Sequence, residues 1–147
     1  MPQFETLDIS GEAGIRAFGD DLKELFMNAA LGMYSLITDA EAVGERKAIE
    51  ISLESNSLEG LLISWLNELI FHFDTYGFIG KKIAITEFVP WEDKPAGGQF
   101  AVRAFVSGEE FDPLRHQGKL LIKAATYHKL RIQRTGETWE TQIIFDI

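Results

Sequence analysis

Residues 119–147 read KLLIKAATYHKLRIQRTGETWETQIIFDI, and this stretch decides the fold. The residues from Trp139 to Ile147 alternate with a period of two, which is typical of a β-strand. One face carries Trp139, Thr141, Ile143, Phe145 and Ile147, and the other carries Glu140, Gln142, Ile144 and Asp146. Residues 120–134 form another strand pattern, and Thr135-Gly136 between the two is typical of a tight turn. We therefore expect an antiparallel hairpin that runs to the last residue.

Two amphipathic helices are predicted upstream of this hairpin. The first begins near Asp21, because Asp21 and Glu24 have the spacing of a capping box. The second is expected to stop at Gly77. Their apolar faces consist of Leu22, Leu25, Phe26, Ala29, Met33, Leu36 and Ile37 in the first helix, and of Leu58, Leu61, Leu62, Trp65, Leu66, Leu69 and Phe73 in the second.

The rest of the chain is predicted to form strands and connections. The strand segments are residues 4–7, 14–18, 49–54, 82–89 and 100–106, and residues 90–98, with two prolines and paired glycines, indicate a surface loop. The order strand–strand–helix–strand–helix, followed by further strands, predicts an α+β fold. We expect a single domain over residues 1–147, with two amphipathic helices packed on one face of a largely antiparallel sheet.

Composition narrows the class of protein. A hydrophobic content of 46% with 25% charged residues is ordinary for a soluble globular protein. No apolar run approaches the roughly 20 residues that span a bilayer, and the N-terminus lacks a signal-peptide pattern, so we expect a cytoplasmic protein without membrane contact. The absence of cysteine excludes disulfides and thiol chemistry. A net charge of −9 argues against direct nucleic-acid binding and favours a basic protein partner or cations.

The common enzyme motifs are absent from the sequence. It contains no GxxxxGK[ST], GxGxxG, GxSxG or HExxH pattern, so we do not expect an enzyme. Three histidines remain as candidates for a site. His72 is predicted to be a half-buried helix residue, His116 to lie in a solvent-exposed loop, and His128 to share the core-facing side of its strand.

Two carboxylates meet at the end of the terminal strand. The side chain of Asp146 and the α-carboxylate of Ile147 are one residue apart on an ordered element. Adjacent anionic oxygens at a fixed position suit a hard cation such as Ca²⁺. The alternative is that the strand simply ends there.

Several segments together resemble one known family. Residues 123–130 (KAATYHKL) followed by residues 143–147 (IIFDI) resemble the C-terminal signature of the archease family. Residues 17–26 resemble that family's entry into its first helix, and residues 61–71 resemble its second helix. Residues 111–118 resemble the loop before its last hairpin. The segments occur in order and at compatible spacing along nearly the whole chain.

The resemblance implies a small non-catalytic activator of the GTP-dependent RNA-splicing ligase of the RtcB family. That ligase joins RNA ends in tRNA splicing or RNA repair, and an archease promotes its guanylylation and repeated turnover. Carried over by position, the family's metal ligands become Glu12 and Asp146, with the α-carboxylate of Ile147 beside them. The implied cofactor is a divalent cation, calcium in the first place, with magnesium and manganese as alternatives.

The sequence departs from the family pattern around the first ligand. Ile9 stands where the family has histidine, Ser10 where it has threonine, and Glu12 where it has aspartate. Glu12 keeps the charge but moves its oxygens by about 1.5 Å, which flexible calcium coordination tolerates. Loss of the histidine removes a ligand or an orienting group, at a cost of roughly 10–100-fold in affinity or activity. Asp8 is a candidate for a compensating carboxylate.

Three functions follow as alternatives. The first is a metal-dependent activator of an RNA ligase. The second is a chaperone-like interaction module that has lost this role through the changes near Glu12. The third is a hydrolase with Glu12 and Asp146 as an acid–base pair, which no nucleophile or substrate-positioning motif supports.

Overall fold

The computed structural model describes residues 2–89 and 99–147, so the loop predicted at residues 90–98 lies outside the described residues. The elements are strand β1 (Phe4–Ile9), strand β2 (Glu12–Gly19), helix α1 (Leu22–Ile37), the 3-10 turn η1 (Ala40–Ala42), strand β3 (Lys47–Ser55), helix α2 (Leu58–Tyr76), strand β4 (Phe78–Val89), strand β5 (Phe100–Glu110), strand β6 (Ala124–Thr135) and strand β7 (Thr138–Asp146).

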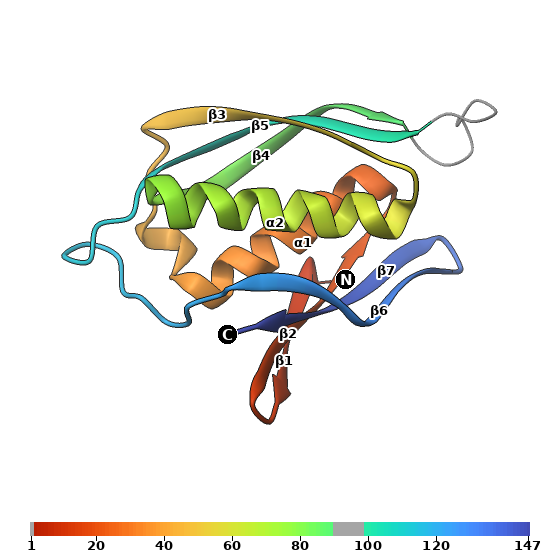
Figure 1. Ribbon diagram of the computed structural model, residues 1–147, viewed down its shortest axis with the longest axis horizontal. Helices are drawn as coiled ribbons and strands as arrows, with labels where there is room; N and C mark the ends of the chain where they lie inside the picture. The colour runs from red at the N-terminus through yellow and green to blue at the C-terminus, as the bar shows by residue number, and fades with distance from the viewer. Residues whose placement is uncertain (1, 90–98) are drawn as a thin grey trace.

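The seven strands form two antiparallel sheets with the helices between them (Figure 1). The first sheet has the order β1-β2-β7-β6, and the second has the order β3-β5-β4. Both helices contact strands of both sheets. The α+β class, the antiparallel strands and the C-terminal hairpin are therefore confirmed. The strands divide into two sheets, where one had been expected, and each sheet covers the helix pair from one side.

Helix α1 shows how a helix fits between two sheets. The ring of Phe26 meets that of Phe88 on β4 with centroids 4.9 Å apart. On another side of the same helix, Gly32 lies so close to the first sheet that an added Cβ would come within 3.0 Å of Ile15 on β2. Small residues such as Gly32 and Ala30 thus form part of the buried helix surface. The apolar stripe identified in the sequence covers only some of that surface.

The ends of both helices follow the predicted signals. The backbone N–H of Glu24 donates to the Asp21 carboxylate at 2.8 Å, and α1 begins at the next residue after Asp21. Helix α2 ends at Gly77, whose φ of 70° is one that glycine adopts without steric cost. Within the described residues, no helix is long and apolar enough to cross a membrane.

Strand β6 contains a bulge of several residues. Its pairing with β7 passes from Thr126 opposite Ile144 directly to Arg131 opposite Gln142. Residues 127–130 thus face a single residue of β7, which adds three residues to β6. An odd number of extra residues exchanges the two faces of the strand.

The bulge explains where the side chains of β6 point. Ala125 before the bulge is buried, and Ile132 after it packs against the core, although their spacing would place them on opposite faces of a regular strand. His128 lies within the bulge and is exposed, so its predicted place on the core side is wrong. Lys129 has a φ of 54°, in the left-handed region that glycine favours.

Candidate functional site

Two of the predicted metal ligands, Glu12 and Asp146, lie in one row on the neighbouring strands β2 and β7, and Ile9 on β1 extends this row without being a ligand. Ile9 on β1 is paired with Glu12 on β2. The register of β2 with β7 pairs Ala13 with Phe145, and one further step places Glu12 opposite Asp146. Ala13 and Phe145 are buried against the core. Since neighbouring strand residues point to opposite faces, Glu12 and Asp146 share the outer face of the first sheet.

The chemistry of this row fits a hard cation. Glu12 and Asp146 are both exposed. Like charges on opposite strand positions repel, and a cation between them would remove that repulsion. Carboxylate oxygens are the donors that calcium and magnesium prefer. The row therefore provides two such donors side by side.

The row has few further ligands of its own. Among residues 2–89 and 99–147, no group of three or more His, Cys, Asp or Glu side chains is placed to hold a metal ion. Asp8 is paired with Ala13, so it points to the opposite face of β1 from Ile9 and does not join Glu12. Ile147 follows Asp146 directly and is exposed. Its carboxylate stays a predicted third ligand.

The segment next to the row is fixed by helix α2. Lys123 donates its backbone N–H to the carbonyl of Asp146 at 2.8 Å, and Ala124 is paired with Asp146. The side-chain amide of Asn67 on α2 accepts from the N–H of Ala125 at 2.8 Å and donates to its carbonyl at 3.3 Å. The helix thus satisfies both backbone groups of Ala125 at the edge of the sheet.

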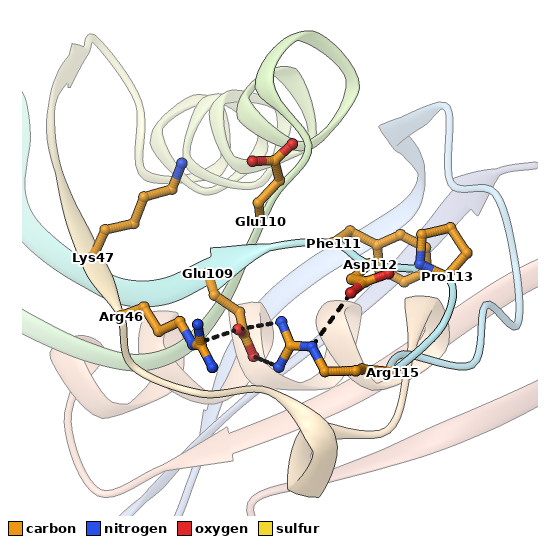
Figure 2. Close-up of a pocket in the computed structure, with 8 residues that line it drawn as sticks. All are labelled: Arg46, Lys47, Glu109, Glu110, Phe111, Asp112, Pro113 and Arg115. Carbon is orange, nitrogen blue, oxygen red and sulfur yellow. Dashed lines mark hydrogen bonds and ion pairs between the residues drawn. The ribbon is translucent and has the colours of Figure 1, made fainter.

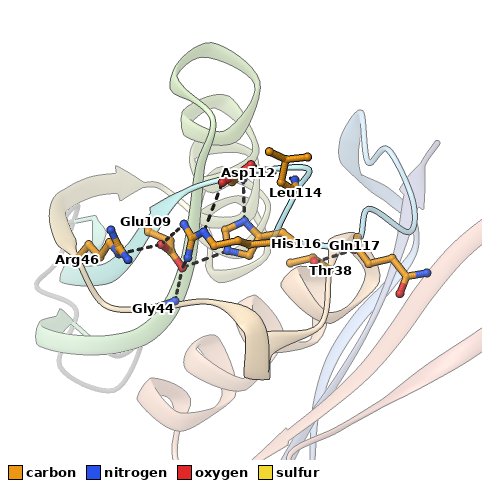
Figure 3. A network of polar contacts seen from close by, with 9 residues as sticks. Thr38, Gly44, Arg46, Glu109, Asp112, Leu114, His116 and Gln117 are labelled. Atoms are coloured by element: carbon orange, nitrogen blue, oxygen red, sulfur yellow. Dashed lines mark hydrogen bonds and ion pairs between the residues drawn. The ribbon is translucent and has the colours of Figure 1, made fainter.

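A second polar site surrounds Glu109 at the end of β5 (Figure 3). We call it the Glu109 cluster, and it comprises Gly44, Arg46, Glu109, Arg115 and His116. The Glu109 carboxylate accepts from Arg115 at 2.8 Å, from His116 Nε2 at 3.1 Å and from the backbone N–H of Gly44, and it pairs with Arg46 at 3.3 Å. Its side chain is only 2% exposed. One buried carboxylate therefore joins β5, the segment before β3 and the loop before β6.

His116 is held at both ring nitrogens. Nδ1 accepts from the backbone N–H of Asp112 at 2.7 Å, so the proton is assigned to Nε2, which donates to Glu109. The residue is 1% exposed, and the expectation of a solvent-exposed histidine is wrong. The loop that contains His116 folds back on itself, and this fold gives each ring nitrogen a hydrogen-bond partner. His72, by contrast, is half-buried as predicted and pairs with Glu68 at 3.4 Å.

The electrostatics of the Glu109 cluster favour a structural role. The hydrogen bond from Arg115, with those from the Gly44 backbone and His116, lowers the pKa of Glu109 from 4.5 to about 2. The backbone N–H of Leu114 and the Arg115 guanidinium likewise lower the pKa of Asp112. A general base works best with a pKa near the working pH. Glu109 is therefore a poor proton acceptor at neutral pH.

The Glu109 cluster borders a surface cavity of about 530 Å³ (Figure 2). Arg46 and Arg115 converge on Glu109, while Lys47 and Glu110 extend away from it. Arg115 also pairs with Asp112 at 3.4 Å. The cations of this cavity are thus largely balanced by carboxylates within it, and its charges hold the loop in place.

The sequence analysis did not identify Glu109. In β5 buried residues alternate with more exposed ones as far as Gly108, and Glu109 breaks this alternation because it is buried as well. An added Cβ on Gly108 would overlap the carbonyl of Ile79 on β4, so only glycine permits this approach of the two strands. A glycine next to an acid at the end of an apolar strand marks the position where the alternation stops.

Together these features define a class of protein: a small α+β domain in which two antiparallel sheets enclose two helices, with a pair of carboxylates on an outer sheet face. Residues 4–147 match the Archease protein family (MTH1598/TM1083). The chain belongs to the archease family.

Individual relatives agree with this assignment. The chain is 34% identical to the protein archease of Methanosarcina acetivorans over 145 residues, covering 99% of this chain and 96% of that one. It is 32% identical to the protein archease of Pyrococcus furiosus over 148 residues, covering all of both chains.

Two solved structures share the fold. The solution structure of Methanobacterium thermoautotrophicum protein 1598 superposes with a TM-score of 0.83 at 29% identity and covers all of both chains. The crystal structure of a Thermotoga maritima archease, described as a possible chaperone, gives a TM-score of 0.62 at 18% identity over 97% of this chain and 96% of that one. The latter similarity concerns the fold alone.

Proposed function

We propose that this chain is a metal-binding accessory protein that activates a GTP-dependent RNA ligase of the RtcB type in tRNA splicing or RNA repair. Family membership over residues 4–147 supports the accessory role. The metal-dependent part is supported by the register of β2 with β7, which pairs Ala13 with Phe145 and, continued by one residue, brings Glu12 next to Asp146. The two positions that the family resemblance implies as ligands are thereby neighbours, although 133 residues separate them in the sequence.

The residues of the chain would act by position and charge. Glu12 and Asp146 would hold a divalent cation, with the Ile147 carboxylate as a third oxygen donor. Such a cation, when bound, neutralises phosphate charge. Glu12 reaches farther than aspartate, and Ile9 cannot coordinate, so the site would depend more on Asp146 than the family pattern implies. The chain itself would hydrolyse no GTP.

The direct test is turnover of the RNA ligase from the same organism, with and without this protein. We expect faster guanylylation and more product per ligase molecule when the protein is present. Asp146→Ala should abolish this stimulation, and Asp74→Ala, which removes an exposed acid on α2, should leave it intact. Glu12→Asp should preserve or improve it. Unchanged turnover with the wild-type protein would reject the proposal.

Metal binding can be measured separately by titration calorimetry with Ca²⁺ and Mn²⁺. We expect one site per chain, weakened at least tenfold by Asp146→Ala and by Glu12→Gln, because each change removes one of two adjacent anionic ligands. The Asp74→Ala variant is again the control for the loss of one negative charge. Equal affinity in Asp146→Ala and wild type would place the cation elsewhere.

A chaperone-like interaction module is the second candidate. The description of the Thermotoga maritima archease as a possible chaperone favours it. In that case the protein should reduce aggregation of a client protein on heating, and Asp146→Ala should do so equally well. Ligase stimulation that depends on Asp146 would favour the first candidate instead.

A further inference from the structure

The positive charge of this acidic chain is concentrated in one segment. Residues 113–136 contain six of the fourteen Lys and Arg residues, two of the three histidines, and none of the 23 Asp and Glu residues. Most of this segment is β6 and the loop that leads into it. Salt screens charges beyond about 8–10 Å, so the local charges of β6 decide what can contact it, in spite of the net charge of −9.

The positively charged side chains of β6 have no carboxylate partner, whereas the arginines elsewhere in the described residues do. Strand β6 is at the edge of its sheet, so one side of it faces no other strand. Among the described residues, Lys129, Arg131 and Arg134 form no ion pair, and Arg134 lies over the ring of Trp139 at 5.8 Å. The four remaining arginines are each within 4.0 Å of a carboxylate: Arg16, Arg46, Arg103 and Arg115.

The bulge in β6 displays an aromatic ring next to these cations. Tyr127 is 62% exposed, and His128 and Lys129 beside it are exposed as well. A regular strand would turn alternate side chains inward, whereas the bulge directs three consecutive side chains to solvent. Lys129 in this bulge has a φ of 54°, which is strained for a residue other than glycine. Such backbone strain is concentrated at functional positions.

We propose that β6 is a binding surface for single-stranded nucleic acid, in which Lys129 and Arg131 contact phosphates and Tyr127 stacks on a base. Unpaired cations beside an exposed aromatic ring are the combination that binds single strands without sequence preference. The function is separate from the proposed ligase activation and does not require the metal. It departs from the expectation drawn from net charge alone.

An acidic peptide is the other ligand that a basic edge strand attracts, and the geometry disfavours it. A peptide added as a strand needs a regular row of backbone N–H and C=O groups. The bulge interrupts that row from residue 127 to residue 130, and bulges and lysines are features that prevent strand addition. A nucleic-acid strand needs only the side chains.

The test is fluorescence anisotropy of a labelled 12-nucleotide oligouridine RNA with the full chain at low salt. We expect saturable binding, with an affinity that falls with salt at a log–log slope of about −1.4 for two phosphate contacts. Lys129→Glu/Arg131→Glu should weaken binding at least tenfold, and Tyr127→Leu about fivefold. Arg131→Glu alone lies outside the bulge and should weaken binding by a smaller factor, so it tests the surface should the double variant fail to fold.

The matched control is Lys23→Glu/Lys82→Glu, which changes the net charge equally at exposed positions on α1 and β4. It should bind RNA no more than threefold more weakly than wild type. The proposal is overturned if wild type shows no saturable binding, if the control variant weakens binding as much as the β6 variant, or if a polyglutamate peptide of equal charge binds as tightly as the RNA.

Discussion

Glu109 shows how one residue can hold several segments. Its buried carboxylate has partners from the backbone of Gly44, from Arg46, and from Arg115 and His116 in the loop before β6. A buried charge is tolerated only when it is paired and hydrogen-bonded, and this one is bonded on both oxygens. The loop therefore depends on the ionised form of Glu109.

Glu109→Gln should change how stability depends on pH. The pKa of Glu109 in the fold is about 2, below its usual 4.5, so its carboxylate stabilises the fold fully above about pH 4.5. That stabilisation is lost as the pH falls toward about 2. Urea unfolding should thus show a large difference in free energy of unfolding between wild type and Glu109→Gln at pH 6, which shrinks below pH 4. A difference that stays constant with pH would contradict this role.

At the scale of elements, α2 and β6 act as one unit. Asn67 on α2 replaces the missing neighbour strand for Ala125 by bonding both of its backbone groups. This contact lies one residue from Ala124, the partner of Asp146, so it fixes the edge of the sheet next to the candidate metal ligands. The position of the ligands is therefore linked to the packing of the helix.

Asn67→Leu should destabilise the fold by about 1–3 kcal/mol, because it leaves the N–H and the carbonyl of Ala125 without partners. Urea denaturation measures this free energy directly. Asn67→Asp is the matched variant: it keeps an acceptor for the N–H, and only its protonated form can donate to the carbonyl, so its loss relative to wild type should be smaller at low pH than at pH 7. Equal stability of Asn67→Leu and wild type would show that water replaces the amide.

At the scale of the whole molecule, the two helices form a shared layer between the sheets (Figure 1). Trp65 on α2 is the largest of its fully buried side chains. Its indole N–H donates to the carbonyl of Phe26 at 3.0 Å, which joins α2 to α1. The hydrophobic core is continuous from one sheet through the helices to the other.

Trp65→Ala should destabilise the molecule by about 3–5 kcal/mol, since it leaves a large cavity in the core and removes the hydrogen bond from α2 to α1. Chemical denaturation followed by circular dichroism gives the value. Trp65→Phe retains much of the volume and should cost less. A loss below about 1 kcal/mol for Trp65→Ala would be inconsistent with a core position.

Local patterns in the sequence determined the elements. The cap at Asp21, the stop at Gly77 and the turn at Gly136 each depend on one or a few neighbouring residues, and the structure confirms all three. The C-terminal hairpin followed from the two alternating patterns in the same way, because its strands are joined by a short turn. The order of these elements along the chain is enough to predict the α+β class.

Tertiary structure alone decided how strands far apart in the sequence pair and which histidines are buried. The division into two sheets, the burial of His116 and the exposure of His128 all depend on contacts between segments far apart in the sequence. The period of a strand pattern shows which side chains share a face, but it does not show which face meets the helices. The three extra residues in β6 reverse that assignment partway along the strand. Glu12 and Asp146 become neighbours for the same reason: the register of β2 with β7 is set by packing over the helices, which no local pattern encodes.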